Sequence, residues 1–238
     1  MRVHKLFRYV VLLIFSVMIL AGFTVVGKGY DMYRNAIEDM SLEEKVASIR
    51  EKEGYTTLED LPDVYKNAVI SVEDHRFYRH FGIDPIAISR AVLHDIQAGR
   101  YVEGGSTITQ QLAKNLYFTN EKEMTRKIAE VFMAFELEEN YSKDEILELY
   151  VNSIYFGDGY YTAGDASRGY FGKEPEMMDE YECTLLAGIP NAPGRYAPTK
   201  SQELAEKRQY QVLKRMEACG YFSKEEAETV ASQMVAFQ

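Results

Sequence analysis

The chain has 238 residues, of which 46% are hydrophobic and 27% charged, and its formal net charge is −10. This composition is typical of a globular protein with a substantial core and excludes a disordered chain. Four bases and no acids precede residue 30, so residues 30–238 carry a formal charge of −14. Such an acidic domain lacks the basic footprint that a nucleic-acid backbone requires, and we expect no nucleic acid among its partners.

An uncharged, strongly apolar segment runs from Tyr9 to Val26. As a helix of about 18 residues it extends roughly 27 Å, close to the hydrocarbon thickness of about 30 Å of a bilayer. A cleaved signal peptide and a buried helix are the alternatives. The apolar region of a signal peptide has about 7–15 residues and ends in a small-x-small site, which Gly27, Lys28 and Gly29 do not provide. We therefore predict a transmembrane signal anchor over residues 9–27.

The charges beside this segment predict its orientation. Arg2, Lys5 and Arg8 precede it without any acid, and the positive-inside rule keeps such an N-terminus in the cytoplasm. Residues 1–8 are then cytoplasmic, and residues 28–238 form an extracytoplasmic domain. We expect its compact part to begin near residue 35, after a very short linker that holds it against the bilayer.

Beyond the anchor, the pattern of apolar residues and capping signals predicts helices almost throughout. Helices are expected over 62–72, over 85–98 with Gly99 just past its end, and over 202–218 before Gly220. Four further starts carry a capping-box signature: Ser41 with Glu44, Thr107 with Gln110, Ser142 with Glu145, and Ser223 with Glu226. No run alternates like a strand, so the fold class is mostly α.

The helices are expected to be joined by four main loops, over Tyr101–Gly105, Thr119–Glu123, Gly157–Gly164 and Pro190–Pro198. The two cysteines, Cys183 and Cys219, lack metal-site spacing. Pairing in an oxidising exterior and burial as free thiols both remain open for them.

Two blocks, one at a helix end and one at a glycine turn, contain residues that could take part in catalysis or bind a phosphate. Glu73 lies at the end of an apolar helix, where a carboxylate can act as a general base. The Gly104-Gly105 turn leads into a helix that opens with Ser106 and Thr107, whose N–H groups and hydroxyls suit a phosphate. A solvated helix end and a plain turn are the simpler interpretations of these features.

A third block supplies positive charge. Lys114 and Arg126 are cations of the kind that binds a diphosphate. Arg126 and Glu130 are four residues apart, which also fits an exposed ion pair on a helix. Residues 73–131 hold eight acids and eight bases, so an anionic substrate would meet least repulsion in this neutral segment.

Five blocks in this order resemble the signature motifs of family 51 glycosyltransferases. They are EDHRFYRHFGID from residue 73, GGSTITQQLAKN from 104, RKIAEVFMAFELE from 126, SKDEILELYVNSIYFG from 142 and LLAGIPNAPGRYAP from 185. The resemblance covers roughly residues 55–200, with small departures at Val151, Asp165 and Ala197. This family comprises the glycan-polymerising domain of class A penicillin-binding proteins and the monofunctional transglycosylases. Because no SxxK or KTG motif is present, the chain looks like the monofunctional kind.

The resemblance implies a lysozyme-like helical domain on the outer face of a bacterial cell membrane, with lipid II and the growing lipid-linked glycan as substrates. Glu73 matches the family's catalytic base, and the reaction would invert an α-linked diphosphate into a β-1,4 bond with release of polyprenyl diphosphate. Glu130 matches a second essential carboxylate. It would orient Lys114 and Arg126, hold a divalent cation (Mg²⁺ or Mn²⁺), or combine the two roles, which is the interpretation we favour; no organic cofactor is expected.

The remaining implied contacts are with the donor sugar and phosphate, through Ser106, Thr107, Gln111 and Asn115. Asp74, beside Glu73, is interpreted as a structural neighbour. The resemblance leaves open further partners among cell-wall synthesis or division proteins. Two other functions are alternatives: a lysozyme-like lytic enzyme, and a catalytically silent scaffold for wall synthesis.

Apolar residues after Pro85 form the last sequence feature. A membrane-dipping region and the protein core are equally good interpretations of this set, which comprises Ile86, Ile88, Val92, Tyr101 and Val102.

Overall fold

The computed structural model describes residues 2–99, 104–118 and 124–234, with side chains from Phe7 onward. The helices in chain order are α1 (Arg2–Asp39), α2 (Leu42–Arg50), α3 (Asp63–Glu73), α4 (Pro85–Ala98), α5 (Ile108–Tyr117), α6 (Met124–Asn140), α7 (Lys143–Val151), α8 (Ala163–Phe171), α9 (Glu180–Gly188), α10 (Pro193–Tyr196), α11 (Gln202–Cys219) and α12 (Lys224–Ala231). Three short 3₁₀ turns lie between them: η1 (Phe77–Arg79), η2 (Pro175–Met177) and η3 (Ile189–Asn191). No strand occurs within the described ranges, which confirms the mostly-α prediction.

The predicted capping boxes form at all four positions. At α2, α5, α7 and α12 the N-cap hydroxyl accepts from the third backbone N–H, and the Glu or Gln side chain accepts from the N-cap N–H. A fifth box, Asp179 with Glu182 at α9, was not anticipated. Gly99 and Gly220 end α4 and α11 with positive φ angles of 62° and 78°, as a left-handed C-cap requires.

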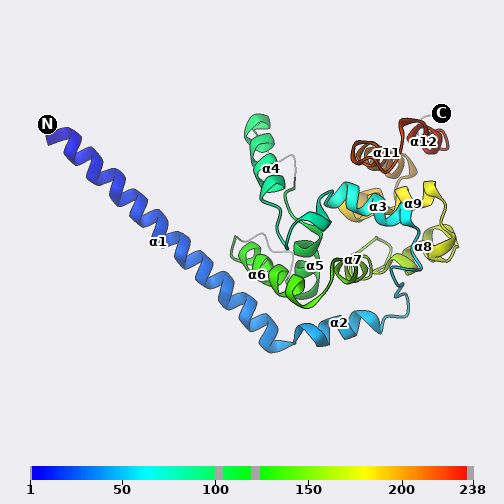
Figure 1. Ribbon diagram of the computed structural model, residues 1–238, viewed down its shortest axis with the longest axis horizontal. Helices are drawn as coiled ribbons and strands as arrows, with labels where there is room; N and C mark the ends of the chain where they lie inside the picture. Colours follow the sequence, from blue (N-terminus) through cyan, green and yellow to red (C-terminus); the bar gives the residue numbers. More distant parts are fainter. Residues whose placement is uncertain (1, 100–103, 119–123, 235–238) are drawn as a thin grey trace.

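The helix α1 differs most from expectation, because it continues without a break to Asp39 (Figure 1). Its first part projects away from the other helices, and its apolar side chains from Phe7 to Val26 are mostly exposed. By length and composition it is a candidate membrane span, with a mean hydropathy of 2.7 and none of the apolar stretch buried. Its last part, from Gly29 onward, packs on α6. The expected short linker is therefore absent: α1 itself continues into the domain.

Two of the expected loops also differ. The segment Pro190–Pro198 contains α10 and the last two residues of η3, and the segment from Gly157 ends at Thr162, where α8 is capped. The loop over Thr119–Glu123, and Tyr101 and Val102 of the loop before Gly104, lie outside the described residues.

Both cysteines are free, with Cys183 buried.

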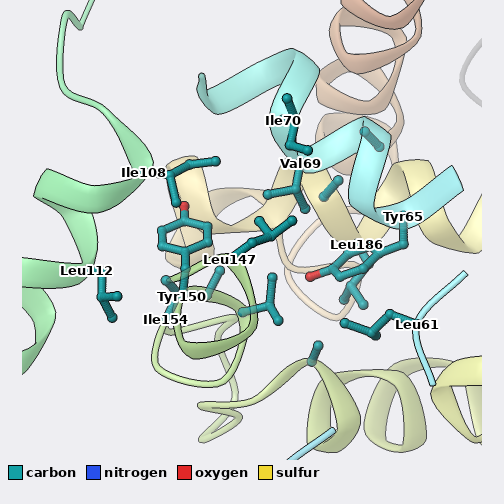
Figure 2. Close-up of a cluster of buried hydrophobic side chains, with 14 of the residues drawn as sticks. Leu61, Tyr65, Val69, Ile70, Ile108, Leu112, Leu147, Tyr150, Ile154 and Leu186 are labelled. Carbon is teal, nitrogen blue, oxygen red and sulfur yellow. The ribbon is translucent and has the colours of Figure 1, made fainter. Parts of the chain in front are cut away.

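The core lies between α3, α5, α7, α9 and α11 (Figure 2). The aromatic rings of Tyr65 and Tyr150 are fully buried there, among aliphatic side chains of these helices. The helix α3 packs on α9 and α11, α5 packs on α6 and α7, and hydrogen bonds from Ile108 to Asp74 and from Gln111 to Glu73 join the end of α3 to the start of α5. This arrangement brings the first and second sequence blocks together.

Candidate functional site

A cleft of about 750 Å³ opens where the end of α3, the start of α5, the start of α4 and one face of α11 meet. Of the predicted site residues, the cleft is lined by Glu73, Ser106, Thr107, Gln111 and Lys114. Arg126, Glu130 and Asn115 are not among its lining residues.

Glu73 is the last residue of α3 and its side chain is half-buried. Burial raises the pKa of its carboxyl above the ordinary value, an effect that the amide of Gln111 and the guanidinium of Arg208 oppose. The Gln111 Nε2 atom donates to Glu73 Oε2 at 2.9 Å, and the hydroxyl of Tyr150 donates to Gln111 Oε1 at 3.2 Å. Gln111, expected at the substrate, thus also orients the carboxylate of Glu73.

Asp74 joins the end of α3 to the start of α5. Its carboxylate accepts from the Ile108 N–H at 3.1 Å and lies 2.8 Å from Nε2 of the buried His80. This geometry agrees with its interpretation as a structural neighbour. Because Asp74 follows Glu73 directly, these two contacts of Asp74 also fix the position of the Glu73 backbone.

The hydroxyl of Thr107 is already used inside the protein. It donates to the Gly82 carbonyl at 2.6 Å and accepts from Gln110 N–H at 3.1 Å, and its residue is 2% exposed. The Ile108 N–H is bound by Asp74. The Thr107 N–H donates to Gln110 Oε1 at 3.2 Å, so neither donor that the sequence suggested at Thr107 is free, and this residue shapes the cleft instead.

Glu130 is buried at 1% exposure and contacts two cations of its own helix. Its Oε1 atom lies 3.2 Å from Arg126 Nε, and its Oε2 atom lies 2.7 Å from Lys127 Nζ. The same Lys127 ammonium donates to Ser106 Oγ at 2.8 Å, so the cluster reaches the rim of the cleft. A buried carboxylate requires such partners. We name the group formed by Arg126, Lys127 and Glu130 the α6 cluster.

Sequence reasoning missed Lys127, although its spacing of three residues from Glu130 was a usable signal. The expected partner, Lys114, instead lines both the cleft and a second hollow of about 410 Å³. Asn115 is exposed and lines only the second hollow. In that hollow the rings of Tyr155 and Tyr161 lie 4.9 Å apart.

The cationic face of α11 was also missed, because the recognised motifs end near residue 200. Arg208 and Arg215, seven residues apart on this helix, both line the cleft. Arg215 donates to the Ser71 carbonyl at 3.4 Å and lies 3.5 Å from His75 Nδ1. Burial, together with Arg215, lowers the pKa of His75, which favours a neutral ring that accepts this contact.

Known proteins match this chain over most of its length. A family model described as transglycosylase matches residues 41–217. Penicillin-binding protein 1A of Aquifex aeolicus (strain VF5) is 44% identical over 183 residues, covering 77% of this chain and 25% of that protein. Penicillin-binding protein 1F of Bacillus subtilis (strain 168) is 44% identical over 193 residues, covering 81% and 27%. The chain thus spans about a quarter of the length of these relatives.

A crystal structure of penicillin-binding protein 1A from Haemophilus influenzae aligns with a TM-score of 0.45 at 22% identity, over 75% of this chain and 17% of that one. The family assignment depends on the sequence matches. The chain belongs to the transglycosylase family, the peptidoglycan glycosyltransferases of family 51 that its motifs resemble.

Proposed function

We propose that this domain polymerises lipid II into β-1,4-linked glycan strands, with inversion at the anomeric carbon and release of polyprenyl diphosphate. One observation carries the proposal. A half-buried carboxyl with a raised pKa, Glu73, lines a cleft together with Lys114 of α5 and Arg208 and Arg215 of α11. A base beside several cations suits a reaction in which a hydroxyl attacks a carbon that carries a diphosphate.

In this mechanism Glu73 removes the proton from the 4-hydroxyl of the acceptor's N-acetylglucosamine. The oxygen attacks the anomeric carbon of the donor strand, the bond from that carbon to the phosphate oxygen breaks, and its electron pair leaves with the diphosphate. A raised pKa brings the base closer to the operating pH, which favours proton transfer. Glu73 lines the cleft, so it then releases its proton to water there.

The leaving diphosphate is a weak base, so it needs stabilisation of charge more than protonation. We assign this role to Lys114 and to Lys127 and Arg126 of the α6 cluster. Glu130 holds the two α6 cations at 2.7 and 3.2 Å, and Ser106 is tied to Lys127. Among the two roles considered for Glu130, the structure favours orientation of cations.

We place the acceptor's diphosphate at Arg208 and Arg215, on the α11 side of the cleft. The donor strand then extends from Lys114 into the second hollow. There the tyrosine pair Tyr155 and Tyr161 offers faces for sugar rings, and Asn115 offers an amide.

A protein-held divalent cation fits the residues poorly. Both oxygens of Glu130 already contact cations, and no group of three or more His, Cys, Asp or Glu residues suited to a metal occurs in the described part of the chain. We therefore limit the Mg²⁺ or Mn²⁺ proposal to an ion that accompanies the diphosphate, and no step above depends on it.

We further propose that α1 crosses a bacterial cell membrane with its N-terminus in the cytoplasm. Exposed apolar side chains of α4, which include Ile86, Ile88, Val92, Leu93 and Ile96, would then contact the bilayer and admit the polyprenyl chain. Their exposure favours the membrane-dipping interpretation of this segment over the core interpretation.

The test is polymerisation of lipid II in detergent with Mg²⁺, with products separated on a gel, for the wild type and Glu73→Gln. Glycan ladders from the wild type alone are the expected result. Shortening of preformed glycan by the wild type would favour the lytic alternative, although a neutral glycan does not explain the cations. Binding of lipid II without turnover would favour a silent scaffold.

A further inference from the structure

The docked part of α1 lies directly on α6, the helix that carries the α6 cluster. Tyr33 is 9% exposed, and its hydroxyl donates to Glu136 Oε2 at 2.8 Å. The rings of Tyr30 and Tyr33 lie 5.2 and 5.8 Å from the ring of Phe132. One rigid helix therefore extends from the exposed apolar segment to the active-site helix.

The two helices approach each other closely at Gly29, which is buried. A Cβ atom added there would lie 2.6 Å from Ile128 Cγ2, 2.7 Å from Ile128 Cβ and 3.0 Å from the Thr125 carbonyl oxygen. The Thr125 carbonyl oxygen belongs to the α6 backbone, and the backbone also fixes the position of Ile128 Cβ. A rotamer change of Ile128 therefore cannot relieve the overlap. By contrast, Gly22 and Gly27 of the same helix have nothing within 4 Å of such an atom.

Glycine inside a helix costs roughly 0.5–1 kcal/mol relative to alanine, so its presence at this contact has to be offset. The contact itself offers the reason. Thr125 and Ile128 flank Arg126 and Lys127 on the first turns of α6. A displacement of α6 as a body leaves the Glu130 contacts of 2.7 and 3.2 Å intact, because they lie within α6, but it moves the whole α6 cluster and changes the distance of 2.8 Å from Lys127 to Ser106 at the rim of the cleft.

We propose that Gly29 is a positioning residue for the reaction. Its missing side chain lets α1 seat on the turn of α6 that presents Arg126 and Lys127, and so fixes these cations relative to the cleft. The inference rests on the proposed function, because it acts through the cations assigned to the leaving diphosphate. It also means that the membrane helix and the diphosphate site form one rigid unit.

The experiment compares full-length wild type with Gly29→Ala and with the matched control Gly27→Ala, in detergent. The measurements are kcat and KM for lipid II polymerisation, the melting temperature, and hydrogen exchange of the α6 backbone. We expect Gly29→Ala to lower kcat about tenfold to 100-fold, since a misplacement of about 1 Å at a reacting site costs this much. The control should stay within about twofold of the wild type, because its added methyl group meets nothing.

A reciprocal variant separates positioning from loss of folding. In Gly29→Ala combined with Ile128→Gly, α1 gains a methyl group and the facing residue of α6 loses its side chain. The double variant therefore lacks both close contacts with Ile128. We expect this pair to recover much of the kcat that Gly29→Ala loses, although the new glycine lowers the melting temperature.

The outcomes distinguish the inference from the function on which it rests. An active wild type with equal kcat and equal α6 exchange in Gly29→Ala would overturn the positioning role. A wild type that makes no glycan would overturn the proposed function. Even then, faster hydrogen exchange of the α6 backbone in Gly29→Ala but not in Gly27→Ala would support the coupling of α1 to α6. Equal losses in Gly27→Ala and Gly29→Ala would also count against it, because the effect would then belong to the helix and not to the contact.

Discussion

Replacing Gln111 by leucine tests how the protein sets the ionisation of Glu73. The Gln111 amide donates to the carboxylate at 2.9 Å and stabilises its ionised form, so it lowers the pKa that burial raises. Leucine has nearly the same size and cannot donate. The pKa of Glu73 should therefore rise further, and less of the base is ionised at any acidic pH.

The magnitude follows from the strength of the lost hydrogen bond. A hydrogen bond to a charged group contributes about 1.5–3 kcal/mol when well shielded, and the partial exposure of Glu73 to the cleft calls for the lower end. About 1.4 kcal/mol changes an ionisation equilibrium tenfold, so the acidic limb of the rate profile should move up by about one pH unit.

The assay is kcat/KM for glycan polymerisation between acidic and mildly alkaline pH. Tyr150→Phe is a graded companion: it removes the donor to Gln111 Oε1 but leaves the amide beside Glu73, so a smaller shift in the same direction is expected. If Gln111→Leu lowers the plateau and leaves the acidic limb in place, Gln111 acts on the substrate alone and the reasoning about the base is refuted.

Three further predictions concern other parts of the site. Lys127→Met should lower kcat about 100-fold, as loss of one oriented charge at a reacting centre does, whereas the exposed Lys207→Met should match the wild type in the same gel assay. Arg215→Gln should raise KM for lipid II several-fold with little change in kcat, and an unchanged KM would place the acceptor elsewhere. Asp84→Asn tests linkage: its partner Arg76 and the backbone of α4 outweigh burial and lower the pKa of Asp84 from 3.8 to about 2. The ionised carboxylate therefore stabilises the fold by about 2 kcal/mol above pH 4, and this stabilisation is lost as the pH falls toward 2. The difference in unfolding free energy between the wild type and Asp84→Asn should close over this window.

Local signals in the sequence predicted much of the fold. Capping boxes such as Ser142 with Glu145 depend on residues three apart, and the structure forms each of them. The catalytic assignments of Glu73 and Glu130 came from the family motifs and remain predictions until the variants are assayed. The absent linker had a physical cause: Gly27 and Gly29 resemble helix breakers in a sequence, but tertiary contact with α6 keeps Gly29 in a helix.

The contacts that tune the site were beyond sequence reasoning because they join distant segments. Gln111 reaches Glu73 across 38 positions, and Lys127 reaches Ser106 across 21. The cations Arg208 and Arg215 enter the cleft only because α11 packs against α3 and α9. Periodicity places such residues on a helix face but does not say which cleft that face lines.

The spacing within the second motif has a structural explanation in α5. Thr107, Gln111 and Lys114 are four and three residues apart, a spacing that puts side chains on one face of a helix. Thr107 caps the helix and binds Gly82, Gln111 orients Glu73, and Lys114 stands between the cleft and the second hollow. Asp74 accepts from the first N–H of α5 and directly follows the base Glu73 in the chain, so Asp74 fixes this face of α5 relative to the base. A shift of α5 would therefore move the cation Lys114 and the ionisation of Glu73 together.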